Sequence, residues 1–322
     1  MTPVYAVYGV RLATTHPFAF RMAPSTGPAD VTFDVVEQGP LPDGWDQGTW
    51  AYEAASETGE RVGGIALHQE WIVARFFDRA DFFIGPGRIL CHLHDPAYEF
   101  AVEIWLLGTA FALWLEARGV PTLHAASVDV AGRAIGFLST NKGGKSSLAA
   151  TFVRSGDSLL GDDILALERE PSGGFLARPG YPQMRFWPDQ ARLLLGSAAG
   201  LERVQPGSTK LRVPIGPPGF GTFTASPRPL AALYLPERDG SASIEIEPIP
   251  LAMAVTELVR HSFLPGVLEA LGMTKRRFVV FAELLRRVPV RRLRYPSGLE
   301  HLPAVREALL RDLGEGVEPL DR

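Results

Sequence analysis

Residues that could bind phosphate follow one another between Leu138 and Leu148. A short apolar run precedes them and a run with helical character follows them. A strand that ends in a turn rich in Gly, Lys and Ser and resumes as a helix leaves unpaired N–H groups where an anion can bind. In the pattern G-x-x-x-x-G-K-[ST], glycines let the backbone curl round phosphates, the Lys neutralises phosphate charge and the hydroxyl holds Mg²⁺. Ser139 stands where this pattern has its first glycine. We predict a phosphate-binding loop that comprises Ser139, Thr140, Asn141, Lys142, Gly143, Gly144, Lys145, Ser146 and Ser147.

Two adjacent carboxylates, Asp162 and Asp163, lie one predicted helix further along the chain. They separate two apolar runs, residues 158–161 and 164–167, and therefore fall at the end of a predicted strand. One carboxylate at such a place can hold Mg²⁺ while its neighbour accepts the proton of an attacking hydroxyl. We assign the metal to Asp162, together with Ser146, and the proton to Asp163. A pair of exposed aspartates in a turn is the alternative.

These motifs resemble the nucleotide-binding core of HPr kinase/phosphorylase-like kinases. The resemblance covers residues 120–235, and the block 179–188 is more similar to diverged members, such as the precursor-peptide kinases of lasso-peptide clusters. It implies an α/β fold with a P-loop kinase core of the HPr kinase/PEP carboxykinase-like type. It rests on Leu123-His124-Ala125-Ala126, the turn at Gly132, Gly144-Lys145-Ser146 and Gly161-Asp162-Asp163, in this order and spacing.

Three further side chains are candidates for the same site. The resemblance implies that His124 orients or tunes Asp163, and a buried histidine satisfied by the backbone is the alternative. It also implies that Lys210 contacts a phosphate or carboxylate, unless this residue is a solvated strand lysine. Arg185 is the preferred arginine for stabilising a transferring phosphoryl group. The HPr kinase motif linked to its phosphorylase reaction is absent, so we do not expect that reverse reaction.

The region before residue 97 is predicted to be rich in strands. We predict a β-rich N-terminal domain over residues 1–96, which serves either partner recognition or structural cover, and a kinase domain over residues 97–322. After Pro250 the apolar periodicity predicts C-terminal helices. The predicted N-terminal strands are residues 4–12, 31–36, 63–67, 71–77 and 88–94, which are short β-branched or aromatic runs between turn residues.

His92 and His94, followed by Asp95, have the alternate spacing that places side chains on one face of a strand. A structural zinc site normally has four ligands, and no second cluster in the sequence completes one. We therefore predict ordinary strand-edge histidines here.

Composition excludes several classes of protein. The chain has 322 residues, of which 46% are hydrophobic, as is normal for a globular protein. Its net charge of −4 gives no reason to expect nucleic acid or an anionic membrane as a partner. A single cysteine and the lack of a signal-peptide pattern predict a cytoplasmic protein. The most apolar segment, residues 98–118, has an uncharged stretch only from Ile104 to Leu115, which is shorter than the ~20 residues that a bilayer requires. We predict a buried helix that packs against the sheet carrying the phosphate-binding loop.

The sequence thus predicts an ATP- and Mg²⁺-dependent kinase that transfers a γ-phosphoryl group to a hydroxyl of a peptide, a protein serine or a small molecule. A homo-oligomer is compatible with the sequence. Two alternatives remain open. A nucleotide-dependent switch ATPase would use Lys142 as the extra lysine of a deviant phosphate loop, and a degenerate nucleotide-binding scaffold would explain Ser139 in place of glycine.

Overall fold

The computed structural model describes residues 2–41, 44, 50–140, 143–239 and 243–315. The chain divides into two compact units. Unit 1 comprises Met1–Thr122 and Phe263–Arg277, and unit 2 comprises Leu123–Ser262 and Phe278–Arg322. This division differs from the predicted boundary between residues 96 and 97. The chain leaves unit 1 after Thr122 and returns to it for a later segment.

Unit 1 is built on a sheet whose described strands have the order β1-β2-β3-β8-β7-β6-β5-β4. The predicted run 4–12 is two strands, because Tyr8 and Gly9 have positive φ and form a turn between them. The alanine-containing strands β4 and β7 were not predicted. The bounds are β1 (Val4–Val7), β2 (Val10–Ala13), β3 (Val31–Val36), β4 (Tyr52–Ala55), β5 (Arg61–His68), β6 (Trp71–Phe76), β7 (Ala80–Ile84) and β8 (Arg88–Leu93).

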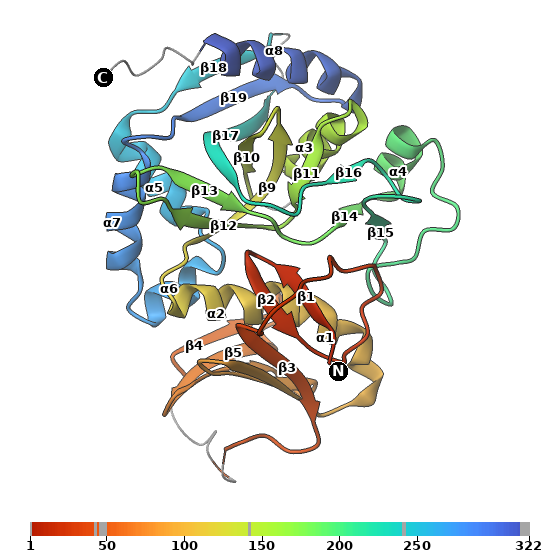
Figure 1. Cartoon of the computed structure of the whole chain (residues 1–322), viewed down its shortest axis with the longest axis vertical. Coiled ribbons are helices and arrows are strands. Elements are labelled where there is room, and N and C mark those ends of the chain that lie inside the picture. Colours follow the sequence, from red (N-terminus) through yellow and green to blue (C-terminus); the bar gives the residue numbers. More distant parts are fainter. Residues whose placement is uncertain (1, 42–43, 45–49, 141–142, 240–242, 316–322) are drawn as a thin grey trace. The chain divides into compact units, whose positions relative to one another are not determined.

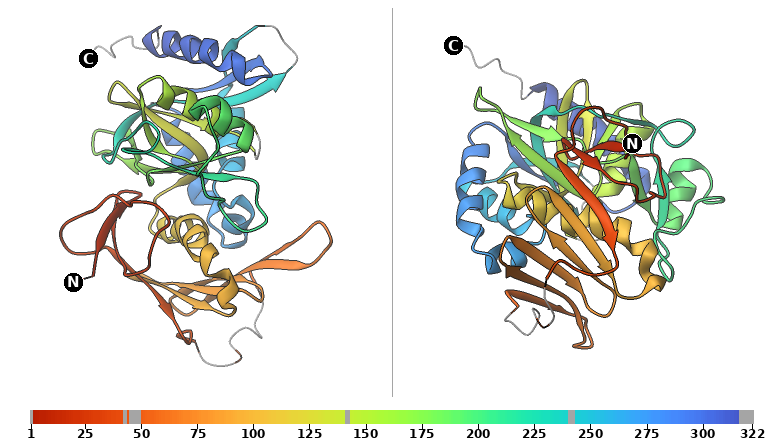
Figure 2. Two further views of the ribbon diagram at one scale, coloured as in Figure 1. Left: turned by 90° about the vertical axis from the view of Figure 1, so that its right-hand side faces the viewer. Right: turned by 60° about the horizontal axis from the view of Figure 1, so that its bottom comes forward.

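A helical run lies along one face of this sheet (Figure 1, Figure 2). It consists of η2 (Pro96–Tyr98), α1 (Glu99–Trp105), the π-helical η3 (Leu106–Ala110) and α2 (Phe111–Ala117). The Trp105 ring stacks on Phe76 with centroids 4.3 Å apart, and the Tyr8 hydroxyl donates to the Leu107 carbonyl at 2.8 Å. The prediction of a buried helix agrees with this packing on the sheet of unit 1, whereas the predicted phosphate loop belongs to unit 2.

The same run, Pro96–Ala117, is long and apolar enough to span a membrane by length and composition. However, 67% of its most apolar window is buried within the structure, as in the core helix of a soluble protein.

A later segment completes unit 1 with α6 (Pro265–Ala270) and the first turn of α7 (Thr274–Leu284). The guanidinium of Arg277 forms an ion pair with Glu116, and both side chains are about 4% exposed. Glu116 also accepts hydrogen bonds from the backbone N–H and hydroxyl of Thr122, at 2.8 and 2.5 Å. This buried cluster attaches the later segment to α2.

The main sheet of unit 2 runs β16-β11-β9-β12-β13-β17-β19-β18 over the described residues, and β10 pairs with both β9 and β17. Strands β10, β17 and β19 are parallel neighbours, so their carboxyl ends reach the same edge of the sheet. Its strands are β9 (Thr122–Val130), β10 (Arg133–Leu138), β11 (Ser158–Gly161), β12 (Ile164–Arg169), β13 (Phe175–Arg178), β16 (Thr222–Phe223), β17 (Arg228–Asp239), β18 (Glu245–Pro248) and β19 (Val290–Pro296).

Helices cover both faces of this sheet. Ile135 and Phe137 of β10 pack in one core with α3 (Lys145–Arg154) and α8 (Leu302–Glu315). The alternate residues Ala134 and Leu138 pack in a second core with α5 (Leu251–Arg260) and the later part of α7. This period of two follows from the pleat of the strand. The small sheet of β14 (Gln183–Phe186) and β15 (Leu211–Pro214), together with α4 (Pro188–Leu195), adds to the first core, and η4 (Leu299–His301) precedes α8.

The C-terminal region is not purely helical as predicted, because β19 lies between α7 and α8. Leu293 and Tyr295 are buried in the first core, while arginines of β19 form ion pairs. Arg292 lies 3.0 Å from Glu237, and Arg294 lies 3.2 Å from Glu247. Burial of alternate apolar side chains therefore decides the strand conformation.

Candidate functional site

The connection from β10 to α3 lines a cleft of about 440 Å³ in unit 2. Gly144 caps α3 with φ 95°, a left-handed conformation that glycine adopts without a steric penalty. The first N–H groups of α3 have no acceptor within the helix and are available to an anion. Residues Gly143, Gly144, Lys145, Ser146 and Ser147 line the cleft, whereas the predicted positions Asn141 and Lys142 lie outside the described residues.

Lys145 lies against the loop that precedes it. Its ammonium group donates to the carbonyls of Ser139 at 2.6 Å and Thr140 at 3.3 Å. The side chain is buried, and this desolvation lowers the pKa of Lys145, although the charges of Asp162 and Asp163 oppose the shift. The lysine charge is therefore held at the start of α3, beside both carboxylates.

Ser139 stands where the phosphate-loop pattern has a glycine. Its φ is not positive, so the serine does not have to adopt a left-handed conformation. Its hydroxyl donates to the Thr140 carbonyl at 3.2 Å. The residue that needs to be small is Gly143, because a Cβ there would overlap the Ser139 hydroxyl. The substitution at Ser139 is thus compatible with a closed turn.

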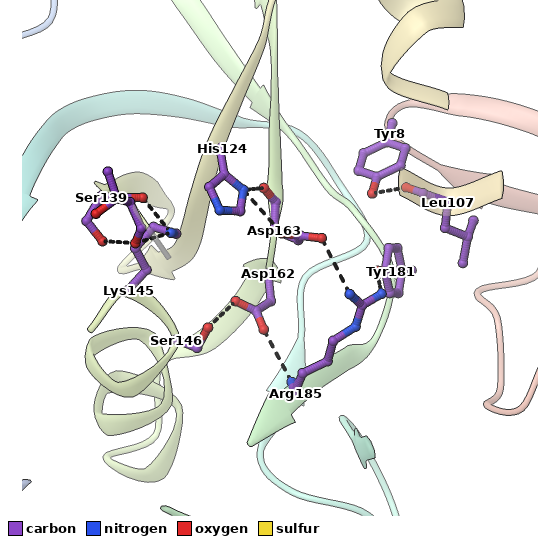
Figure 3. A network of polar contacts seen from close by, with 11 residues as sticks. Tyr8, Leu107, His124, Ser139, Lys145, Ser146, Asp162, Asp163, Tyr181 and Arg185 are labelled. Carbon is purple, nitrogen blue, oxygen red and sulfur yellow. Dashed lines mark hydrogen bonds and ion pairs between the residues drawn. The ribbon is translucent and has the colours of Figure 1, made fainter. Parts of the chain in front are cut away.

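Asp162 faces the first turn of α3 (Figure 3). Its Oδ1 accepts a hydrogen bond from the Ser146 hydroxyl at 2.8 Å, and its Oδ2 accepts from the Arg185 backbone N–H at 3.3 Å. Burial, and then the neighbouring charge of Asp163, raise the pKa of Asp162. The two predicted metal ligands are thus brought together by the turn between β11 and β12 and by the start of α3.

Asp163 points away from Asp162 toward two cationic or polar partners (Figure 3). Its Oδ1 lies 3.2 Å from His124 Nδ1, and its Oδ2 lies 3.6 Å from a terminal guanidinium nitrogen of Arg185. Burial alone would raise the pKa of Asp163, but the hydrogen bond from His124 and the charge of Arg185 outweigh it and lower the pKa. Asp163 also has φ 96°, a conformation that aspartate adopts more readily than most residues. The carboxylate is thus ionised and held by a strained backbone, a combination found at functional sites.

His124 makes both kinds of contact that the sequence left open, one with the Asp163 carboxylate and one with the backbone. Its Nδ1 lies 3.0 Å from the backbone carbonyl of Asp163 as well as near the carboxylate of the same residue. Its backbone N–H donates to the His261 carbonyl at 2.8 Å. The imidazole is therefore oriented by the turn that carries Asp163.

The far rim of the cleft comes from β14, β15 and α4. Lys210 lies over the ring of Trp187, with its ammonium nitrogen 5.3 Å from the ring centroid. Gln190 accepts a hydrogen bond from the Trp187 backbone N–H at 2.8 Å and donates to the Ser147 hydroxyl. Gln190 therefore links the start of α4 to the start of α3. Arg185, Trp187, Gln190 and Lys210 all line the cleft.

Three of the residues that line the cleft were not predicted to belong to the site, namely Trp187, Gln190 and Arg238. Gln190 lies three residues after Trp187, which is the spacing of a capping box at the start of a helix. This spacing can be read from the sequence. Arg238 is near the carboxyl end of β17, next to the strand that precedes the phosphate-binding loop. Only knowledge of the strand order could have identified it, because ligands bind at that edge of such sheets.

In unit 1, Asp81, His92 and His94 bring their ligand atoms within 4.8 Å of one another, close enough for a metal ion. Asp95, the partner considered from sequence, instead caps η2 by accepting from the Ala97 N–H. Arg75 donates two hydrogen bonds to the Asp81 carboxylate, at 2.7 and 2.8 Å. A guanidinium therefore already neutralises the one carboxylate of this cluster.

Comparison with known proteins adds little to this geometry. No protein-family model matches the chain, and no curated protein matches it. Among solved structures, the chain is similar to the Hpr(Ser) kinase/phosphatase from Coxiella burnetii, at 13% identity and a TM-score of 0.28, over 61% of this chain and 98% of that one. A likeness of this size is a distant one of fold.

Proposed function

We propose that this chain is a kinase that transfers the γ-phosphoryl group of a nucleoside triphosphate, ATP in the simplest case, to a hydroxyl. The observation that carries the proposal is the different surroundings of two adjacent carboxylates. Asp162 is hydrogen-bonded to the Ser146 hydroxyl at the start of α3, and Asp163 is paired with His124 and Arg185 in the same cleft. A metal ligand and a proton acceptor need this separation of roles.

The phosphates would lie on the N–H groups at the start of α3. Gly143 and Gly144 leave room for the phosphate oxygens, and Lys145 supplies a positive charge beside them. Lys145 donates to the carbonyls of Ser139 and Thr140, and the third N–H donor of its ammonium group could bind a phosphate oxygen. Lys210 and Arg185 add positive charge on the opposite rim.

Ser146 and Asp162 fit Mg²⁺, because a hydroxyl and a carboxylate oxygen 2.8 Å apart are the hard oxygen donors that this ion prefers. When bound, Mg²⁺ would neutralise charge on the β- and γ-phosphate oxygens. Burial and the charge of Asp163 raise the pKa of Asp162, and a cation bound there would favour the ionised form of this carboxyl.

Asp163 would accept the proton of the acceptor hydroxyl. As that proton moves to the carboxylate, the acceptor oxygen bonds to the γ-phosphorus, the bond from the γ-phosphorus to the bridging oxygen breaks, and the nucleoside diphosphate leaves. Arg185 would stabilise the negative charge on the transferring group, and His124 would keep the Asp163 carboxylate oriented. The acceptor would be a peptide, a protein serine or a small molecule with a hydroxyl group.

The test is an acceptor screen with the full chain, Mg²⁺ and ATP labelled on its γ-phosphoryl group. Serine-terminated peptides, small proteins and small hydroxyl compounds are offered together, and the products are identified by mass spectrometry. We expect label on one acceptor class with the wild type and with Lys275→Met, an exposed lysine outside the cleft, but not with Lys145→Met. Label found only in inorganic phosphate would favour the switch ATPase, and binding of ATP with neither transfer nor hydrolysis would favour the degenerate nucleotide-binding scaffold.

A further inference from the structure

A second, smaller hollow lies beside the start of α3. This hollow measures about 70 Å³ and shares Gly144, Ser147 and Arg238 with the cleft. Four additional residues line it, namely Tyr295, Gly298, Leu299 and Leu302. All of them belong to unit 2.

The order of strands explains why these residues meet the phosphate-binding loop. Strands β10, β17 and β19 are adjacent and parallel, and Arg238 and Tyr295 are register partners near the carboxyl ends of β17 and β19. The chain then passes through Gly298 and η4 into α8. The connection after β19 therefore lies at the edge of the sheet where β10 leads into the loop.

Tyr295 lies directly against Gly144. A Cβ on Gly144 would lie 2.7 Å from the Tyr295 hydroxyl oxygen, so the tyrosine packs directly on the glycine that begins α3. The Tyr295 side chain is buried, which raises its pKa to about 12 and keeps the hydroxyl neutral. A ligand held by the first turn of α3 thus has the side chains of the hollow within reach.

The chemistry of the hollow differs from that of the cleft. Among the described residues that line the hollow there is no carboxylate, and its walls are the apolar side chains of Leu299 and Leu302, the Tyr295 ring and the guanidinium of exposed Arg238. A guanidinium stacks on the face of a planar aromatic group, and leucine side chains bury its other surfaces. The carboxylates, Lys145 and Arg185 line only the cleft, where the reacting phosphate would be.

We propose that this hollow receives the nucleobase of the nucleotide whose phosphates bind at the start of α3, with the base lying against Arg238 and the apolar wall of Leu299 and Leu302. The inference rests on the proposed function, because it assumes a phosphate chain on that helix. It adds that the protein selects a nucleotide and not a bare polyphosphate.

The experiment compares the affinities of the full chain for Mg²⁺-ATP and for Mg²⁺-tripolyphosphate by titration calorimetry. The wild type should bind ATP at least about tenfold more tightly, since stacking of one base contributes a factor of this order. Leu299→Trp, which fills the hollow, should abolish the preference for ATP while changing tripolyphosphate affinity less than about twofold. Arg238→Ala should reduce the preference in the same direction. Arg238 is exposed, so this substitution tests the proposal even if Leu299→Trp fails to fold.

Arg294→Ala is the matched control, because Arg294 is on β19 next to Tyr295 but pairs with Glu237 and Glu247 and does not line the hollow. It should keep the preference of the wild type. Equal wild-type affinities for ATP and tripolyphosphate, or an undiminished preference in both hollow variants, would overturn the inference and leave the proposed function intact. Failure of the wild type to bind either compound would overturn both.

Discussion

Asp163 has a left-handed backbone conformation that the sequence did not predict, and its carboxylate lies between His124 and Arg185. The adjacency of two aspartates after a phosphate-binding pattern was enough to propose a metal ligand and a base. Which aspartate faces the Ser146 hydroxyl depends on the φ of Asp163, and that conformation depends on the surrounding fold.

The pH dependence of catalysis should depend on His124. The hydrogen bond from His124 lowers the pKa of Asp163, so its loss raises that pKa and protonates the base at higher pH. In His124→Ala, the acidic limb of the kcat/KM profile should therefore move to higher pH. His124→Asn, which can still donate a hydrogen bond, should recover part of the shift. A lower rate with an unchanged pH profile would show that His124 has no effect on the ionisation of Asp163.

The connection from β10 to α3 has a recognisable sequence pattern, because glycine, lysine and serine each have a distinct physical task in a phosphate-binding turn. The strand β19 was missed because its arginines mask the apolar alternation, and their ion pairs with Glu237 and Glu247 become visible only once β17 and β18 are adjacent to it. Consequently the wall of the hollow, which follows β19, was missed as well.

Gly144 and Gly156 lie at opposite ends of α3, and comparing them distinguishes backbone strain from steric crowding. Gly144 and Gly156 have φ 95° and 102°, so alanine at either position should cost about 1–2 kcal/mol of stability, measured by thermal unfolding. A Cβ at Gly144 meets the Tyr295 hydroxyl, whereas a Cβ at Gly156 has no atom within 4 Å. We expect Gly144→Ala, and not Gly156→Ala, to weaken ATP binding by about tenfold or more. Equal affinities in the two variants would argue against phosphate binding at Gly144.

The division of the whole chain into two units differs from the one that composition and periodicity predicted. The segment Phe263–Arg277 returns to unit 1, and its buried Arg277 meets Glu116 on α2. A contact between residues so distant in sequence leaves no local signal, so the predicted boundary at residue 96 followed the change from strand to helix patterns. The strand-rich character of the N-terminal region, in contrast, is a local property, and most of those strands were predicted.

Arg277→Met should destabilise unit 1, because it leaves the Glu116 carboxylate buried without its partner. Breaking a buried ion pair in this way costs on the order of 3–5 kcal/mol. Thermal or urea unfolding followed by circular dichroism measures the loss. Arg276→Met, at the exposed neighbouring position, should be close to neutral, and adding Glu116→Gln to Arg277→Met should restore part of the stability.

The most direct test of the account is the transfer rate of Asp163→Asn, measured in a single turnover with γ-labelled ATP and the acceptor, together with its ATP affinity. Asparagine also tolerates the left-handed conformation at this position, so the backbone is preserved. Asp189→Asn, an exposed aspartate paired with Arg192, is the control. We predict a transfer rate at least about a hundredfold lower for Asp163→Asn, with ATP affinity within about threefold of the wild type. Transfer by Asp163→Asn at a rate close to that of the wild type would contradict the assignment of Asp163 as the base and, with it, the proposed mechanism.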